Sequence, residues 1–138
     1  MRVLLDTCIL SELKCPIPNS IVIQSIQEID KNNLFISTLS IGEITKGVAL
    51  LEDGKRKHDL NSWILGLEQY YADHIIPIDL ETARIWGEVT AKAQKLGKAI
   101  PAIDGLIAST ALRHGLHLMT RNTSHFEPTG VLLINPFQ

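Results

Sequence analysis

The stretch VLLDTCILSEL (residues 3–13) joins a run of apolar residues directly to an amphipathic segment and places a carboxylate, Asp6, at the junction. A short, continuously apolar run is typical of a strand that is buried on both faces. Residues 7–14 have the spacing of an amphipathic helix. The stretch therefore predicts a strand that passes straight into a helix, with a charged group where the two meet.

The same alternation of apolar runs and helical segments continues along the chain. Strands are predicted for RVLL (2–5), LFIS (34–37), IIPI (75–78), HLMT (117–120) and VLLI (131–134). Helices are predicted at 7–14, 20–31, 40–52, 57–72, 80–97 and 103–114, bounded by Pro, Gly, Asn and Asp, and EDGKRK (52–57) is predicted as a loop. Strands that alternate with helices predict an α/β fold with a mainly parallel sheet covered on both faces.

Composition narrows the class of protein. A chain of 138 residues that is 45% hydrophobic, with a mean hydropathy of +0.12, fits one domain spanning residues 1–138. Its net charge is −2, so a nucleic-acid site must be local. The only cysteines, Cys8 and Cys15, form no Cys-x-x-Cys pair, which favours a reduced, cytoplasmic protein. No segment resembles a signal peptide or a membrane span.

Three carboxylates fall where predicted helices begin. Asp6 follows the first strand, Glu43 lies in STLSIGEI one turn into a helix, and Asp104 lies in IPAIDGLIAS one turn into another. Helix N-termini and the carboxyl ends of parallel strands share one edge of an α/β sheet, where ligands collect. Clustered carboxylates repel one another unless a cation neutralises them, and oxygen ligands without His or Cys select Mg²⁺ or Mn²⁺.

Each acid also has a purely structural explanation. Asp6 is placed to cap the helix that follows it. Ser40 and Glu43 have the spacing of a capping box, in which the glutamate bonds back to the serine amide. Asp104 would be favoured by the positive end of its helix.

Four segments resemble the successive motifs of PIN-domain ribonucleases, specifically the VapC and FitB type toxins of bacterial toxin–antitoxin modules. They are VLLDTCILSEL, ISTLSIGEITKGV, IPAIDGLIASTALRHGLHLMTRNTSHF and the terminal GVLLINPF, in the family's order. The resemblance implies a three-layer α/β/α PIN-like sandwich. It also implies that Asp6, Glu43 and Asp104 are catalytic and hold Mg²⁺ or Mn²⁺.

The chain departs from the family pattern in two places. Cys8 replaces a common Asn, and a small buried thiol is expected to fill the same space. The segment TRNTSHF lacks the fourth carboxylate of many PIN domains and offers Thr120, Asn122 and His125 instead. Thr120 and Asn122 are supporting candidates; the Asn122 amide would orient a metal-bound water or simply form a turn. His125 is left outside the metal shell.

The resemblance implies an endoribonuclease toxin in which a metal-activated water cuts RNA, with Glu43 or Asp104 accepting the proton. Its products would keep a 5′-phosphate. The implied partners are a cognate antitoxin protein, an RNA substrate and a second copy in a homodimer, with no membrane. The alternative is a catalytically silent PIN-like domain that binds RNA or protein, and metal-dependent cleavage separates the two.

RNA contact needs positive charge near the acids. Arg121 lies beside a predicted strand end, and the run Lys55-Arg56-Lys57-His58 is a second candidate, although such a run is more often a solvated surface. The aromatic-rich segment 62–71 fits core packing, a groove shared with the helix 40–52 for an antitoxin peptide, or a homodimer interface. Trp63 and Trp86 lie at helical spacings that favour packing over base stacking.

A receiver-like phosphoacceptor domain is a further alternative of similar size. It would have paired acids after its first strand and a lysine after a late one. Here Thr7 follows Asp6, and VLLINPF contains no lysine.

Overall fold

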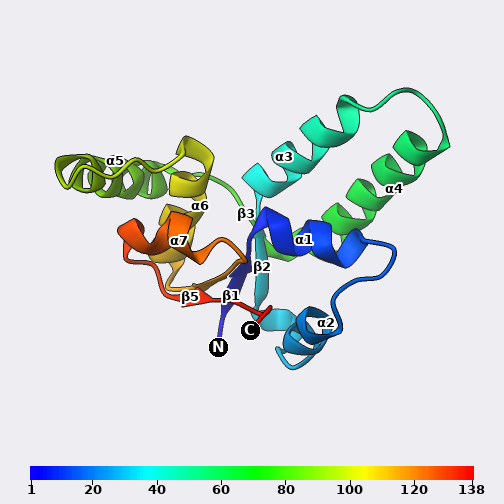
Figure 1. The fold of residues 1–138 in the computed structure, drawn as a ribbon, viewed down its shortest axis with the longest axis horizontal. Coiled ribbons are helices and arrows are strands. Elements are labelled where there is room, and N and C mark those ends of the chain that lie inside the picture. Colours follow the sequence, from blue (N-terminus) through cyan, green and yellow to red (C-terminus); the bar gives the residue numbers. More distant parts are fainter.

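Five short parallel strands form the centre of the computed structural model, which describes all 138 residues (Figure 1). Their order across the sheet is β3-β2-β1-β4-β5. They span Ile75–Ile76 (β3), Leu34–Ser37 (β2), Val3–Leu5 (β1), His117–Met119 (β4) and Leu133–Ile134 (β5). All four pairings are parallel, with Val3 opposite Leu34 and Leu5 opposite Met119. The central strand, β1, is the one that begins the opening stretch of the sequence.

Helices cover both faces of this sheet, so the predicted three-layer α/β/α sandwich is confirmed (Figure 1). They are α1 (Thr7–Lys14), α2 (Ser20–Gln27), α3 (Thr38–Ala49), α4 (Lys55–Tyr70), α5 (Leu80–Lys95), α6 (Ala102–His114) and α7 (Thr123–Phe126). Three short 3₁₀ turns, at Lys31–Asn33, Ala72–His74 and Glu127–Thr129, complete the chain. No helix is long and apolar enough to cross a membrane.

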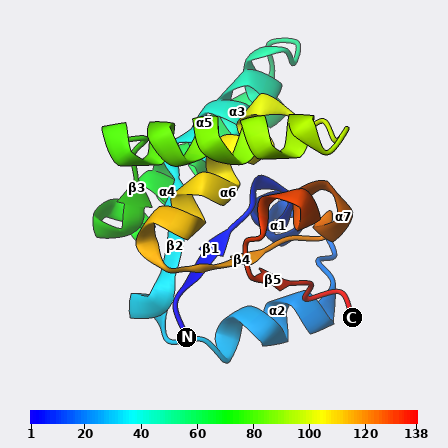
Figure 2. The same cartoon turned by 90° about the vertical axis from the view of Figure 1, so that its left-hand side faces the viewer.

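Each face of the sheet has its own hydrophobic core, because side chains alternate along a strand. Val3 and Leu5 of β1 point into a core shared with α1 to α4. Leu4, between them, points into a second core shared with α6 and α7. All three residues are fully buried, as expected for a strand in a parallel sheet covered on both sides. In Figure 2, α5 lies across α6 as an outer layer; the Trp86 ring of α5 packs directly against Gly105 of α6.

Several predicted element boundaries were wrong by a few residues, for local reasons. The α3 helix begins at Thr38 rather than at residue 40, because the Ser37 hydroxyl accepts the N–H of Leu39 and caps the helix there. The strand predicted at 75–78 ends at Ile76, since Pro77 has no N–H for the ladder. The strand predicted at 131–134 begins only at Leu133. The Val131 N–H is taken by the Thr129 hydroxyl.

Three further segments differ from the prediction. The segment predicted as a loop at 52–57 already forms the first turn of α4 from Lys55 onward, so the basic run lies on a helix. The helix predicted at 20–31 ends at Gln27, and Asp30 starts a separate 3₁₀ turn by accepting the N–H of Asn32. The short α7, within TRNTSHF, was not predicted at all.

Candidate active site

The three predicted carboxylates lie at one edge of the sheet. Asp6 directly follows β1, and Glu43 lies on the helix that follows β2. Asp104 lies in the first turn of α6, which runs back to the sheet and leads into β4. Thr120 directly follows β4. The carboxyl ends of the neighbouring strands β1, β2 and β4 therefore bring these residues to one place, as the parallel topology requires.

Asp6 is buried and held on both of its carboxylate oxygens. Its Oδ1 accepts the backbone N–H of Thr7 at 2.8 Å, which makes Asp6 the N-cap of α1 as the structural interpretation predicted. Its Oδ2 accepts the hydroxyl of the fully buried Thr120 at 2.8 Å. Only 5% of Asp6 is exposed. Burial raises its pKa; the hydrogen bonds from Thr120 and Thr7 oppose that rise, and Asp104 adds to it by repulsion.

Cys8 packs beside Asp6 as the sequence indicated. Its thiol donates to Asp6 Oδ2 at 3.5 Å and packs against the hydrophobic core on that side of the sheet. Burial raises the pKa of this thiol, so it stays protonated and unreactive at neutral pH.

Glu43 is held by the Thr7 hydroxyl and does not form the predicted capping box. The cap of α3 is Ser37, so Glu43 lies beyond the helix's first turn. Its Oε1 accepts the Thr7 hydroxyl at 2.7 Å, and that hydroxyl also lies 2.8 Å from the buried Ser40 hydroxyl. The spacing of Ser40 and Glu43 thus reflects their common contact with Thr7, which the sequence analysis had not selected.

Asp104 lies beside a histidine, unlike the other two acids. Its side chain is 25% exposed, and its Oδ2 lies 3.6 Å from Nδ1 of the exposed His125. Burial raises the pKa of Asp104; His125 opposes that rise and Glu43 adds to it. Burial and the neighbouring Glu43 therefore act against the charged form of this carboxylate, while the positive end of α6 favours it.

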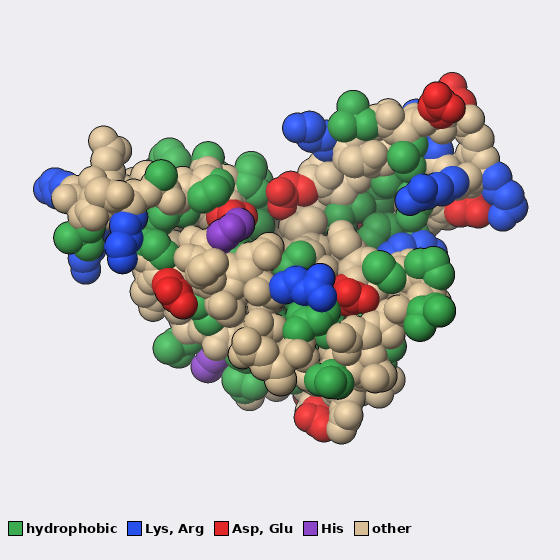
Figure 3. Space-filling view, viewed as in Figure 1, with side chains coloured by type: hydrophobic (Ala, Val, Ile, Leu, Met, Phe, Trp, Pro, Cys, Tyr) green, Lys and Arg blue, Asp and Glu red, His purple; other side chains and the backbone are tan.

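The acids lack basic partners. Neither Asp6 nor Glu43 forms an ion pair, and Asp104 has only His125. Figure 3 shows acidic side chains gathered where this face is hollowed between α6 and α3. In the present side-chain arrangement no three Asp, Glu, His or Cys residues lie close enough together to hold a metal ion. Glu43 is turned toward Thr7, whose hydroxyl donates to it.

This donor set still fits a hard divalent cation by its chemistry. It offers carboxylate oxygens from three elements, two of which have pKa values raised by burial and by a neighbouring acid. A divalent cation would offset both the burial of these charged carboxylates and the repulsion between them. Carboxylate oxygens are the ligands that Mg²⁺ and Mn²⁺ prefer.

The remaining candidates from TRNTSHF lie at the rim. The exposed Asn122 precedes α7; its backbone N–H donates to Thr120 Oγ1 at 3.0 Å, while its side chain makes no capping bond. The Arg121 guanidinium lies 3.9 Å above the Phe137 ring. The structure therefore connects Thr120 directly to Asp6 and brings neither the Arg121 nor the Asn122 side chain into contact with a carboxylate.

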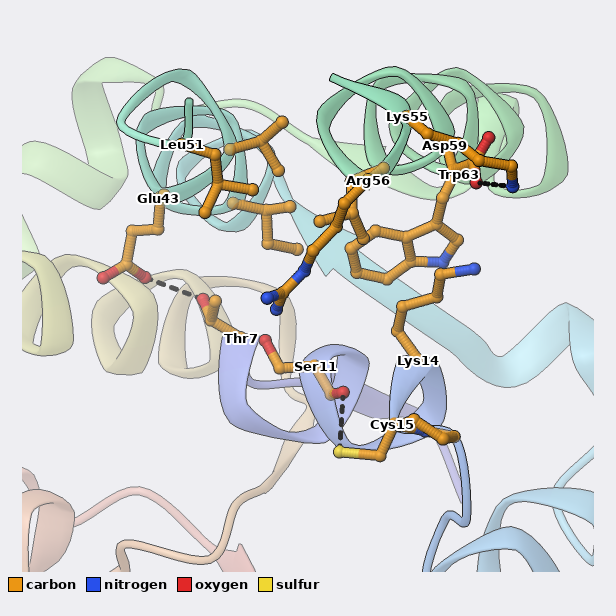
Figure 4. A pocket seen from close by; sticks show the side chains of 15 residues that line it. Thr7, Ser11, Lys14, Cys15, Glu43, Leu51, Lys55, Arg56, Asp59 and Trp63 are labelled. Atoms are coloured by element: carbon orange, nitrogen blue, oxygen red, sulfur yellow. Dashed lines mark hydrogen bonds and ion pairs between the residues drawn. The ribbon is translucent and has the colours of Figure 1, made fainter. Parts of the chain in front are cut away.

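A groove of about 1110 Å³ opens beside Glu43, between α1, α3 and α4. Thr7 and Glu43 lie at one end of it, and Trp63 of the aromatic-rich segment lines its wall (Figure 4). Trp63 also packs against the hydrophobic core, while Leu65 and Tyr70 of the same helix are exposed. The segment 62–71 thus contributes to a groove shared with α3, as one interpretation predicted.

Thr7 is expected to position Glu43. In Thr7→Val both hydrogen bonds of the hydroxyl are lost and the buried Ser40 hydroxyl loses its partner. We expect a loss of about 1–3 kcal/mol in unfolding free energy. Any reaction that depends on Glu43 should slow about 10- to 100-fold. Thr7→Ser keeps the hydroxyl and should retain most of the unfolding free energy and most of the reaction rate. Equal rates for the wild type and Thr7→Val would show that Glu43 needs no such support.

The chain is similar to known proteins both in sequence and in structure. The sequence profile of the PIN domain matches residues 3–130. Toxin FitB of Neisseria gonorrhoeae is 36% identical over 139 residues, covering 98% of this chain and 98% of FitB. The VapC ribonuclease Y4jK of Sinorhizobium fredii is 34% identical over 137 residues, covering 99% and 98%. The crystal structure of FitAcB from N. gonorrhoeae superimposes with a TM-score of 0.93 at 34% identity, covering 99% of both chains.

Proposed function

The chain belongs to the PIN-domain family and resembles its FitB and VapC toxins over nearly its whole length, and from this we propose that it is a divalent-metal-dependent endoribonuclease toxin. The observation that best supports the proposal is the position of Asp6, Glu43 and Asp104 at one strand-end edge, without a basic side chain to neutralise the first two. The ribonuclease name of the S. fredii relative supports the choice of RNA as substrate.

We propose that Asp6, Glu43 and Asp104 hold Mg²⁺ or Mn²⁺. When bound, such an ion supplies positive charge for the phosphodiester and lowers the pKa of a water molecule toward neutrality. Asp6 is the fixed member, because Thr7 and Thr120 hold its two oxygens in place. Glu43 is exposed and can move, within the limit set by its bond to Thr7.

Asp104 or Glu43 accepts the proton of the attacking water. Both carboxylates lie at the strand-end edge where this water would be held, and neither pairs with a lysine or an arginine. Because the nucleophile is water, the RNA 2′-hydroxyl takes no part. By analogy with the family, the 3′-oxygen is the leaving group, so the products should carry a 5′-phosphate and a 3′-hydroxyl. Asn122 would support the reaction from the rim, and the buried Thr120 would support it through its bond to Asp6.

The proposed partners follow from the relatives. A cognate antitoxin is proposed to occupy the groove between α1, α3 and α4 and so to cover Glu43. A second copy of the chain is proposed to pack on exposed apolar side chains, such as Leu65 and Tyr70 of α4. We propose that the protein acts in the cytoplasm, where RNA is available as its substrate.

The function is tested by incubating the purified chain with total bacterial RNA in Mg²⁺, in Mn²⁺ and in EDTA. We expect discrete fragments with 5′-phosphate ends in either metal and intact RNA in EDTA. Intact RNA in all three conditions would instead favour the alternative, a silent PIN-like domain that binds RNA or protein. Fragments that form equally well in EDTA would reject the metal site.

A further inference from the structure

Two hollows of the surface meet at Glu43. The groove between α1, α3 and α4 has Glu43 and Arg56 among its lining residues. A smaller hollow of about 430 Å³ lies where α3 approaches the start of α6, and Glu43 and Lys46 line it together with Ile103 of α6. Glu43 therefore lies on a ridge, with a hollow on each side of it.

Each hollow contains a basic side chain that forms no ion pair. On α4, Lys55 pairs with Asp59 at 2.9 Å and Lys57 pairs with Asp53 at 3.2 Å. Arg56, between them, has no acidic partner. Figure 4 shows its guanidinium directed away from the Lys55–Asp59 pair and toward Thr7 of α1. The basic run thus divides into two lysines bound to surface acids and one arginine directed into the groove.

Lys46 lines the smaller hollow, on the other side of Glu43 from Arg56. It lies three residues after Glu43 on α3, so both side chains project from one face of that helix. It is exposed and forms no ion pair. In Figure 3, basic side chains lie over the α3 and α4 side of the hollowed face, next to the acidic side chains at its centre.

A strand of RNA is repelled by the acids and needs cations beside them. We propose that Arg56 and Lys46 bind backbone phosphates on either side of the one that is cut, so that the RNA crosses α3 at Glu43. This inference rests on the proposed function, because it names how the substrate of that same site is held. Arginine suits such a contact since its guanidinium binds phosphate oxygens in pairs. These contacts recognise the phosphates of the RNA and not its bases.

The test measures RNA binding apart from cleavage. Asp104→Asn serves as the background, and all samples contain EDTA so that no RNA is cut. The probe is a fluorescein-labelled oligouridine, which has no base pairing, and its anisotropy gives the dissociation constant at several NaCl concentrations. Arg56→Ala, Lys46→Ala and Arg56→Lys are compared with Lys55→Ala, which removes a neighbouring lysine that already has an acidic partner.

We expect Arg56→Ala and Lys46→Ala each to weaken binding about three- to tenfold and to lower the slope of log K against log [NaCl] by about 0.7. Arg56→Lys should retain most of the slope, and Lys55→Ala should bind like the background protein. Circular dichroism of each variant checks that the fold is intact.

The proposal is overturned if Arg56→Ala and Lys46→Ala bind RNA as the background does, if Lys55→Ala loses as much as they do, or if the background protein binds no RNA. Variants that bind RNA normally but no longer bind the antitoxin would assign these cations to the protein partner instead. Failure of this proposal can be distinguished from failure of the proposed nuclease activity. RNA cleavage by the wild type with no effect at Arg56 or Lys46 rejects only the RNA path. Weakened RNA binding with no cleavage by the wild type rejects only the nuclease.

Discussion

Replacing Asp104 with asparagine is expected to reduce RNA cleavage by at least about 1000-fold, since a metal-binding carboxylate contributes several kcal/mol to transition-state stabilisation. The side chain keeps its size, and it caps no helix through a hydrogen bond. The loss should therefore come from chemistry and not from folding. Initial rates of fragment formation in Mg²⁺, measured beside the wild type, give the ratio.

The same variant should be as stable as the metal-free wild type or more stable. Burial and Glu43 raise the pKa of Asp104, so the folded chain holds this proton more tightly than the unfolded chain does. Stability is then lost as the pH rises from the ordinary carboxyl pKa through the raised folded value, and it stays lower at neutral pH. Asparagine carries no charge and removes that loss.

Chemical unfolding of both proteins at pH 7 in EDTA measures this difference in stability. If Asp104 served only the positive end of α6, Asp104→Asn would lose about 0.3–1 kcal/mol. Full cleavage activity in the variant would contradict its place in the site, and a clear loss of stability would support the helix-dipole interpretation.

Phe126→Ala is expected to have the largest effect on stability. Phe126 is the largest of the fully buried side chains, and it joins the short α7 to the core formed by Leu4, Leu118 and α6. Truncating such a ring costs about 3–5 kcal/mol, from lost burial and the cavity left behind. Because α7 also carries His125, the contact with Asp104 should weaken together with the helix. Urea unfolding of both proteins gives the difference.

Phe137→Ala is the matched control. Phe137 is only partly buried and lies under the Arg121 guanidinium at 3.9 Å, where a cation–π contact contributes about 0.5–1 kcal/mol. Its truncation should therefore cost much less than that of Phe126. A loss below about 1 kcal/mol for Phe126→Ala would show that α7 is not anchored by this side chain.

The layers of the fold could be predicted from the sequence because each strand is a short apolar run buried on both faces. β1 is the clearest case, since Val3, Leu4 and Leu5 serve two cores at once. The ends of elements could not be predicted as well. They depend on single side-chain bonds, such as Ser37 at the start of α3, or on one N–H, such as that of Val131.

The short α7 shows a different limit. Thr123–Phe126 is too short for helical periodicity to be visible, and its only strong signal is one aromatic residue. What holds it in place is Phe126 in a core that α6 and β4 share with Leu4 and Ile76, two residues far away in sequence. Tertiary packing therefore determines this helix, and local propensity does not.

The location of Asp6, Glu43 and Asp104 at one edge could be predicted, because parallel topology gathers strand ends and helix starts there. Their hydrogen bonds could not. The Ser40 and Glu43 spacing matched a capping box, while in the fold both side chains contact Thr7 from the neighbouring α1. The signal that would have found Thr7 is a hydroxyl residue directly after the strand-end aspartate, but its partner is 36 positions away.

Binding of Mn²⁺ to the protein tests most directly whether the three carboxylates form a metal site. Titration calorimetry with the wild type and with Asp104→Asn in the absence of RNA measures this without any cleavage. We expect the wild type to bind Mn²⁺ and Asp104→Asn to bind it at least about tenfold more weakly. Equal binding by the two proteins, or no binding by the wild type, would show that the three carboxylates do not form a metal site.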